Sequence, residues 1–482
     1  MAPAAPAGLP GATGVSGAAS GLAWLRARPV LAVVLLGTLG LLLAHAWFYR
    51  FLTDDAFISF RYARNLSHGA GLVFNPGQER VEGYTNFLWV LLLAALDRMG
   101  VRPEFGAPLL SVLATVLLWA LVVRETLRRP VVARGAWLVV VPVLAFAVTR
   151  SIAVWSSSGL ETRAFELLLI AGVFRLRSEV ERAGEASAPF PLAAVLLGLA
   201  LWTRPDGMLM AGSVFAAALL WLARRGRLEP GRLLRMAAPL FMLIAVQLIF
   251  RRAYYGEWLP NTYYAKIGGR LWWGAGLQYV GAFALEYAVW LWLPLVALGA
   301  RQRTREGQGL DLLLYAAIVL PHILYVIAIG GDHFEYRPLD VYFPLLYLLL
   351  FDGARALARG PRTNLATAGW LAFTLLGLWE LPWQSHRQSP GQYVAGFPGR
   401  SLARPEMRDF LAPSRDPIYH LPGLRAIAAA HRRLLGAVTA RFAGVRQEEH
   451  RRFFDMRFGD RKNLLNGRVD EIPEFCGISC FH

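Results

Sequence analysis

Long apolar stretches recur along this chain at short intervals, and this repetition limits the fold more than any other feature. The first, residues 29–49, is long enough to cross the roughly 30 Å of a bilayer's hydrocarbon core as a helix. Further apolar segments lie at 84–97, 106–123, 136–149, 164–174, 191–203, 208–223, 236–250, 277–299, 312–329, 341–351 and 365–381. We therefore expect an all-α polytopic membrane protein.

The first apolar segment has two interpretations. Ala44-His45-Ala46 looks like the small-residue cleavage site of a signal peptide, but the apolar stretch before it is too long for one. We therefore predict a retained signal anchor. Residues 1–28, which begin with uncharged Ala, Gly and Pro, are expected to form a disordered cytoplasmic leader.

Charge composition fits a membrane protein. Charged residues make up 17% of the chain, against about 25% in ordinary soluble domains. The net charge of +17 would suggest a nucleic-acid partner in a soluble protein, but in a chain this apolar it reflects where arginines lie relative to the bilayer. We expect no nucleic-acid partner. Only two of the 50 basic residues are lysines, Lys266 and Lys462.

Arginine placement predicts the topology. Short cytoplasmic connections collect Arg and Lys, and the Arg-rich connections are 124–134, 175–182, 224–235, 301–305 and 355–362. All of them lie on the side of the N-terminus only if 84–97, which is short and has a polar start, does not span. We therefore expect about eleven spans (10–13) within residues 29–381. The first outer loop would carry juxtamembrane helices, and the Arg-rich tail 382–482 would lie outside the membrane on the periplasmic side.

Two features of the tail leave alternatives open. Residues 425–446 have helical periodicity and fit either a helix on the membrane surface or a small extramembrane domain. Cys476 and Cys480 fit a small disulfide in an outside location, or two unpaired thiols.

The remaining connections fall together on the outer face and are rich in acidic, aromatic, Asn and Gly residues: 50–83, 150–163, 203–207, 251–276 and 330–341. Two adjacent carboxylates, Asp54 and Asp55, follow the first span, where charge is costly unless it binds something. They can act as a general base or hold a divalent cation such as Mg²⁺ or Mn²⁺. The structural alternative is the N-cap of a helix.

Five motifs in these outer segments resemble one known family. They lie at 54–89, 156–162, 204–207, 255–266 and 330–337. In this order they resemble the polytopic GT-C glycosyltransferases. Within these, they are most similar to the group that contains terminal arabinofuranosyltransferases and proteobacterial proteins linked to flagellar motor control. The resemblance covers about residues 29–350 and does not include the tail.

The resemblance implies an enzyme of the bacterial inner membrane with a periplasmic active face. A sugar carried on a polyprenyl-phosphate lipid would pass to a hydroxyl of a glycan or lipid acceptor, in a cavity between the membrane and the outer loops. The donor phosphate needs cations and the acceptor needs a base. No nucleotide is expected, and the sequence has no Gly-rich phosphate loop.

Residue roles follow from the resemblance. Asp54 is the expected base, with Asp55 orienting it or binding metal. Lys266, with Arg251 or Arg252, is assigned to the donor phosphate; its alternative is an interfacial lysine that extends to the headgroups. Other substrate-binding candidates are Asn86, Glu161, Arg204, Asp206, Asn261, Tyr264, Asp332, His333 and Arg337. Three of these acids have a structural alternative, an ion pair of Glu161, Asp206 and Asp332 with Arg163, Arg204 and Arg337 in that order. For His333 the alternative is a plain polar loop residue, and for Tyr264 an aromatic belt.

Two other classes of protein stay open. A transporter of a lipid-linked substrate would place charged residues near the middle of its spans, where only Glu286 and His322 stand out. A non-catalytic assembly factor for motility or the envelope could retain the same fold.

Overall fold

The computed structural model describes residues 23–388, apart from positions 24, 49, 51, 131–132, 184–189, 263–270, 272, 333–335 and 359. Most of the expected leader and the tail from 389 onward therefore lie outside the described residues, together with 425–446, Cys476 and Cys480. Within the described part the chain is helical and contains no strand.

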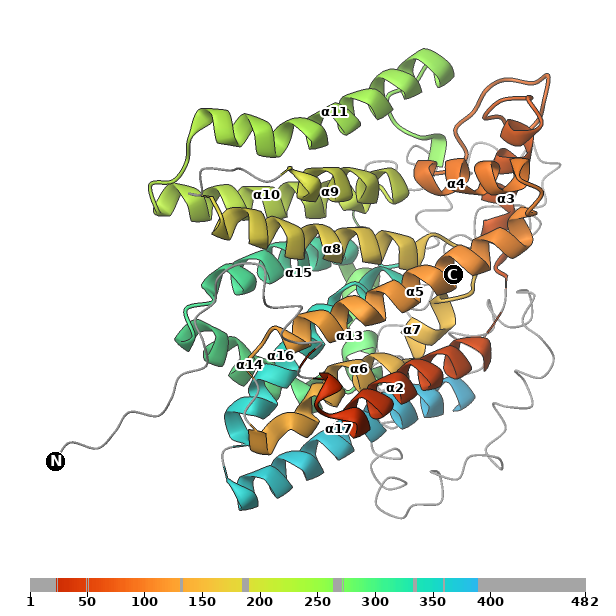
Figure 1. Ribbon diagram of the computed structural model, residues 1–482. Helices are drawn as coiled ribbons and strands as arrows, with labels where there is room; N and C mark the ends of the chain where they lie inside the picture. The colour runs from red at the N-terminus through yellow and green to blue at the C-terminus, as the bar shows by residue number, and fades with distance from the viewer. Residues whose placement is uncertain are drawn as a thin grey trace.

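The helices lie side by side in a bundle, with α11 along one edge and α2 and α17 along the opposite edge (Figure 1). In chain order they are α2 (Pro29–Phe48), α3 (Asp54–Ser67), α4 (Phe87–Arg98), α5 (Pro103–Leu127), α6 (Val140–Val148), α7 (Arg150–Trp155), α8 (Thr162–Glu181), α9 (Leu192–Thr203), α10 (Asp206–Arg224), α11 (Pro230–Tyr255), α13 (Trp273–Glu286), α14 (Val289–Arg305), α15 (Gly309–Ala328), α16 (Tyr342–Leu357) and α17 (Pro361–Gln388), with short 3₁₀ helices η1 (Ala133–Val139) and η2 (Arg337–Leu339).

The polytopic helical membrane fold is confirmed. Five of the described helices, α2, α5, α10, α11 and α15, are long and apolar enough to cross a bilayer. Shorter apolar helices, among them Ala136–Val148 and Leu192–Thr203, accompany them. The expected number of about eleven spans stays a prediction, because it depends on how these shorter helices sit in the membrane.

One apolar segment differs from its prediction. The sequence indicated a single segment over 277–299, but the structure divides it into α13 and α14 at Tyr287 and Ala288. Ala288 is buried and has a positive φ of 48°, a conformation that ends a helix. The sequence did not indicate this break, because neither a Gly nor a Pro lies at Tyr287 or Ala288.

Glycines allow helices to meet backbone to backbone. A Cβ atom built on Gly299 would lie 1.9 Å from the carbonyl oxygen of Leu349, and one built on Gly353 would lie 1.9 Å from that of Leu295. The backbones of α14 and α16 are therefore in direct contact, as small residues permit between membrane helices.

The helices α3 and α4 form a separate lobe at one end of the bundle (Figure 1). With α7 they enclose their own apolar core, in which Phe60, Trp89 and Trp155 are almost fully buried. The 12 residues of α4 cover only about 18 Å at 1.5 Å per residue. This length agrees with our expectation that 84–97 does not span the membrane.

Charged side chains gather at the opposite end of the bundle, which we call the arginine-rich end. Glu125 accepts hydrogen bonds from Arg128 and Arg177, and Arg177 also bonds to Asp311. Arg303 pairs with Asp311 as well. A second set of ion pairs joins Asp352 to Arg129 and Arg355, and Arg355 to Glu306. The arginines of these pairs belong to four of the connections that we expected on one side of the membrane.

The expected outer segments meet at the other end, which we call the motif end. The backbone N–H of Thr53 donates to the carbonyl of Ser158 (3.1 Å). That of Asn261 donates to the carbonyl of Glu82 (3.1 Å). Since α5 and α8 each run from one end of the bundle to the other, the division of the connections into two groups is consistent with the topology deduced from arginine placement.

Candidate active site

The acidic pair begins α3. Thr53, with extended backbone (φ −79°, ψ 151°), occupies the N-cap position, so the structure does not support the alternative in which an aspartate caps the helix. Asp54 and Asp55 are the first two helical residues, where the helix dipole favours negative charge. Asp55 is partly buried, and the side chain of Asp54 lies outside the described residues. The role of base therefore stays a prediction.

Glu161 lies next to this helix start and joins two motifs. Its carboxylate accepts a hydrogen bond from the amide of Asn86 (2.9 Å), and Asn86 also exchanges hydrogen bonds with the hydroxyl of Ser59 on α3. All three side chains are buried. The alternative ion pair between Glu161 and Arg163 is wrong, because Arg163 is buried against Glu166 and Asp340.

Arg204 and Asp206 form a buried ion pair between α9 and α10. The guanidinium donates two hydrogen bonds to the carboxylate, from Nε (3.0 Å) and from Nη2 (2.7 Å). The same carboxylate contacts Nε2 of His322 at 3.2 Å, and Nδ1 of His322 lies 2.7 Å from the hydroxyl of Tyr342. This chain of contacts connects α10 to α15 and α16, so it holds the orientation of Arg204 from three elements.

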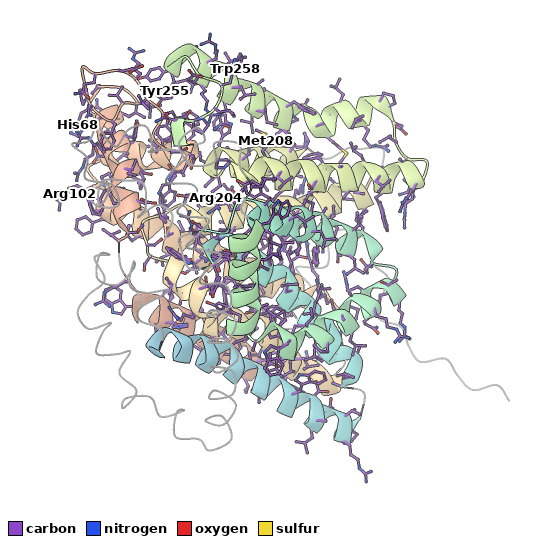
Figure 2. All side chains as sticks on the ribbon, turned by 180° about the vertical axis from the view of Figure 1, so that it is seen from behind. His68, Arg102, Arg204, Met208, Tyr255 and Trp258 are labelled. Carbon is purple, nitrogen blue, oxygen red and sulfur yellow. The ribbon has the colours of Figure 1, made fainter. Side chains whose placement is uncertain are left out.

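Arg204 is surrounded by carboxylates. Burial alone would lower its pKa, but Asp206 raises it, and Glu161 and Asp332 act in the same direction. Asp332 is also paired with Arg337 at 3.3 Å. The described part of the site thus sets two guanidinium groups against three carboxylates. In Figure 2 Arg204 lies nearer the middle of the molecule than His68 and Arg102, which mark the outer edge of the lobe.

Two of the cations expected at the donor phosphate already have partners. Arg251 forms a bidentate pair with Glu82, with Nη2 and Oε1 3.1 Å apart, and both side chains are buried. Burial raises the pKa of Glu82, although Arg251 opposes this shift. Arg252 is exposed and donates to the carbonyl of Gly256. Asn261 is exposed and contacts Glu82 through its backbone.

Three other expected residues, Lys266, Tyr264 and His333, lie outside the described residues. Within the part of the chain that the structure describes, no three His, Cys, Asp or Glu side chains lie close enough together to hold a metal ion.

Sequence reasoning missed the partners of these residues. Glu82 belongs to the first motif but received no role, and His322 stood out only as a polar residue within a span. Asp340 had no assignment. It is fully buried, accepts hydrogen bonds from Arg163 and Ser151, and its pKa is raised to about 6 by burial despite both contacts. The sequence signal that could have indicated Asp340 is its position directly before the apolar segment 341–351.

Comparison with known proteins gives two sequence relatives, both named terminal β-(1→2)-arabinofuranosyltransferase. The protein of Corynebacterium glutamicum is 32% identical over 336 residues, which is 63% of this chain and 48% of the relative. That of Mycobacterium tuberculosis is 31% identical over 369 residues, which is 69% of this chain and 57% of the relative. The chain thus spans about half the length of these relatives. No family model matches it.

The solved structures of ArnT from Cupriavidus metallidurans have the same arrangement of helices. The form bound to undecaprenyl phosphate matches with a TM-score of 0.54 at 14% identity, over 87% of this chain and 75% of ArnT. The apo form matches with a TM-score of 0.53. The chain has the GT-C fold. Our inference of this fold from five short motifs is therefore confirmed, and so is the predicted similarity to proteins named terminal arabinofuranosyltransferase.

Proposed function

We propose that this chain is a GT-C membrane glycosyltransferase that moves a sugar from a polyprenyl-phosphate donor to a hydroxyl of a glycan or lipid acceptor. The observation that carries the proposal is the convergence of the outer motifs at one end of the bundle, where Asn86, Glu161, Arg204 and Asp332 come together from separate loops. The names of the two sequence relatives make arabinofuranose the first sugar to test.

In this proposal Asp54 removes the proton of the acceptor hydroxyl as its oxygen attacks the anomeric carbon of the sugar. The bond from that carbon to the phosphate oxygen breaks, and polyprenyl phosphate leaves with the bonding electrons. Asp55 orients Asp54. We assign Glu161 and Asp206 to accept hydrogen bonds from sugar hydroxyls, since carboxylates are strong acceptors.

The charge of the described site indicates that sugar hydroxyls and the donor phosphate bind to different residues. Three carboxylates against two guanidinium groups, joined by the acidic pair, suit hydroxyl-rich ligands better than a phosphate. Positive charge for the phosphate must come from elsewhere, and we assign it to Lys266 and Arg252. We also propose that the acidic pair binds a divalent cation such as Mg²⁺ or Mn²⁺, which would supply charge neutralisation for the phosphate.

A transfer assay tests the proposal. The purified full-length chain in lipid nanodiscs is given polyprenyl-phosphate arabinofuranose and a neutral arabinofuranoside acceptor. We expect an elongated acceptor and released polyprenyl phosphate in equal amounts, and lower rates after chelation that recover with Mg²⁺ or Mn²⁺. Intact donor after long incubation, with this sugar and with a panel of hexose donors, would instead favour the assembly factor.

A labelling experiment tests the membrane orientation. We propose that the motif end is periplasmic and the arginine-rich end cytoplasmic. With Cys476 and Cys480 changed to Ser, a cysteine at the exposed position Gln78 should react with an impermeant maleimide in whole cells. One at the exposed position Arg227 should react only after permeabilisation. The reverse pattern would invert the orientation.

A further inference from the structure

A groove of about 480 Å³ opens on the lobe formed by α3 and α4, and none of the residues assigned above lines it. Two of its residues, Ile58 and Tyr62, belong to α3. The others come from the loop that follows: Phe74, Asn75, Gln78, Glu79, Val81 and Gly83. The groove therefore combines a helix face with a loop that carries both amides and a carboxylate.

Two aromatic side chains line the groove, one of them buried and the other exposed. Tyr62 is almost fully buried. Its hydroxyl donates to the carbonyl of Val81 (2.6 Å) and accepts from the backbone N–H of Gly83 (3.0 Å), so it cannot rotate freely. The ring of Phe74, which is 39% exposed, lies 5.8 Å from that of Tyr62. Phe74 is therefore the aromatic ring of the groove that a ligand can reach. The guanidinium of Arg61 lies over this ring, 4.5 Å from its centroid, so a sugar would pack its weakly positive C–H groups on the part of Phe74 that Arg61 does not cover.

A hydrogen-bonded chain fixes which polar atoms the groove offers. Arg61 can only donate, and its Nη2 donates to Oδ1 of Asn75 (2.7 Å). The amide nitrogen of Asn75 therefore donates to Oε1 of Gln78 (2.9 Å). Gln78 is left with the two N–H groups of Nε2, for which no acceptor is found among the described residues. Glu79 adds an exposed carboxylate as an acceptor.

The groove lies in line with the acidic pair. Asp55, Ile58 and Tyr62 are spaced i, i+3 and i+7 along α3, so these three positions share one face of the helix. At a rise of 1.5 Å per residue, the groove begins about 5 Å from Asp55 along the helix axis and extends to about 10 Å. At this distance, one end of a short oligosaccharide bound in the groove would reach the start of α3.

From these features we infer that the groove binds the acceptor glycan, one or more rings behind the hydroxyl that receives the sugar. The occupant is a neutral oligosaccharide, because the groove pairs N–H donors with a carboxylate acceptor beside the exposed ring of Phe74. Glu79 disfavours the anionic phosphate of the donor. This inference rests on the proposed function, and it adds an acceptor subsite on the first outer loop.

The test compares acceptors of different length. The full-length protein in nanodiscs transfers arabinofuranose to octyl arabinofuranosides with two or five rings, at saturating donor. We expect a lower KM for the longer acceptor. In the double variant Gln78→Ala/Glu79→Ala this KM rises about tenfold, to that of the shorter acceptor, while kcat and the KM of the shorter acceptor stay the same. Arg80→Ala, an exposed neighbour that does not line the groove, is the matched control.

Equal KM values for the two acceptors in the wild-type protein, or an unchanged length preference in the double variant, would overturn the inference. If the wild-type protein transfers no sugar, the proposed function fails separately. The groove is then judged by saturation-transfer NMR with the five-ring octyl arabinofuranoside alone. Saturation-transfer signals of the sugar that are lost in the double variant but kept in Arg80→Ala would support the acceptor subsite. Signals that persist in the double variant would contradict it.

Discussion

The two ends of the bundle use charged residues differently. At the arginine-rich end buried acids are shared between arginines: Asp311 is paired with Arg177 and Arg303, and Asp352 with Arg129 and Arg355. The ion pairs there form a closed network across α5, α8, α14, α15 and α16. At the motif end the acids also have partners other than arginine: Asp206 contacts His322 as well as Arg204, and Glu161 accepts a hydrogen bond from the amide of Asn86.

This difference indicates what each end does. Shared ion pairs engage most of the donors and acceptors of their members, although Nε of Arg303 and Nε of Arg355 make no hydrogen bond within the described residues. The network therefore fixes the helix ends and leaves little for a ligand. At the motif end Arg204 keeps a hydrogen-bond donor. Nη1 of Arg204 makes no hydrogen bond within the described part of the chain, and Glu161 has an amide rather than a cation as its partner. We therefore expect substitutions at the arginine-rich end to change stability and substitutions at the motif end to change sugar transfer.

The largest expected effect is at the arginine-rich end. Asp352→Ala leaves the buried Arg129 without its carboxylate, and breaking a buried pair in this way costs about 3–5 kcal/mol. Equilibrium unfolding in detergent measures this loss, and transfer per folded molecule should stay the same. Arg305→Ala, at the same end but exposed, should change stability by less than about 0.5 kcal/mol. Equal effects of the two changes would contradict the network.

A smaller effect is expected at Arg204. Arg204→Lys keeps the charge but loses the planar guanidinium, which bonds Asp206 through two nitrogens while Nη1 points away from it. We expect kcat/KM for the donor to fall roughly tenfold to hundredfold, which corresponds to about 1.4–2.7 kcal/mol. Arg129→Lys is the matched change at the other end, and steady-state kinetics should show no loss of transfer for it. A loss for both would remove the distinction between the ends.

The smallest effects distinguish the two candidate partners of Glu161, which are Asn86 in the structure and Arg163 in the alternative from the sequence. A double-mutant cycle of Glu161→Gln with Asn86→Ala should give a coupling energy of about 0.5–3 kcal/mol, as residues in contact do. The cycle with Arg163→Gln should give less, because Arg163 is paired with Glu166 and Asp340. Chemical unfolding measures both cycles. A larger coupling with Arg163 would show that the ion pair considered from the sequence does form.

Much of the fold could be predicted because apolar length and arginine placement are local properties of the sequence. They separated the two sets of connections and identified 84–97 as too short to span. The break at Ala288 was missed, since it depends on a positive φ that an alanine in the sequence does not indicate. The network of ion pairs was missed because its partners are distant in sequence. Arg129 and Asp352, for example, are separated by 223 positions.

Site partners were predictable only where the local geometry was simple. Arg204 precedes α10 with extended backbone (φ −149°, ψ 140°), so it can reach Asp206 two residues later. Glu161 and Arg163 are also two residues apart, but at the start of α8. Residues with this spacing on a helix point in different directions. The same separation in sequence therefore gave one correct pair and one wrong one.

The most direct test compares one isosteric change at each end. Sugar transfer from polyprenyl-phosphate arabinofuranose is measured for Asp54→Asn and Asp352→Asn, at equal amounts of folded protein. We predict that Asp54→Asn loses roughly 10²–10⁴-fold in rate, the usual contribution of a general base, and that Asp352→Asn transfers at the wild-type rate. Wild-type transfer by Asp54→Asn would contradict the assignment of catalysis to the start of α3.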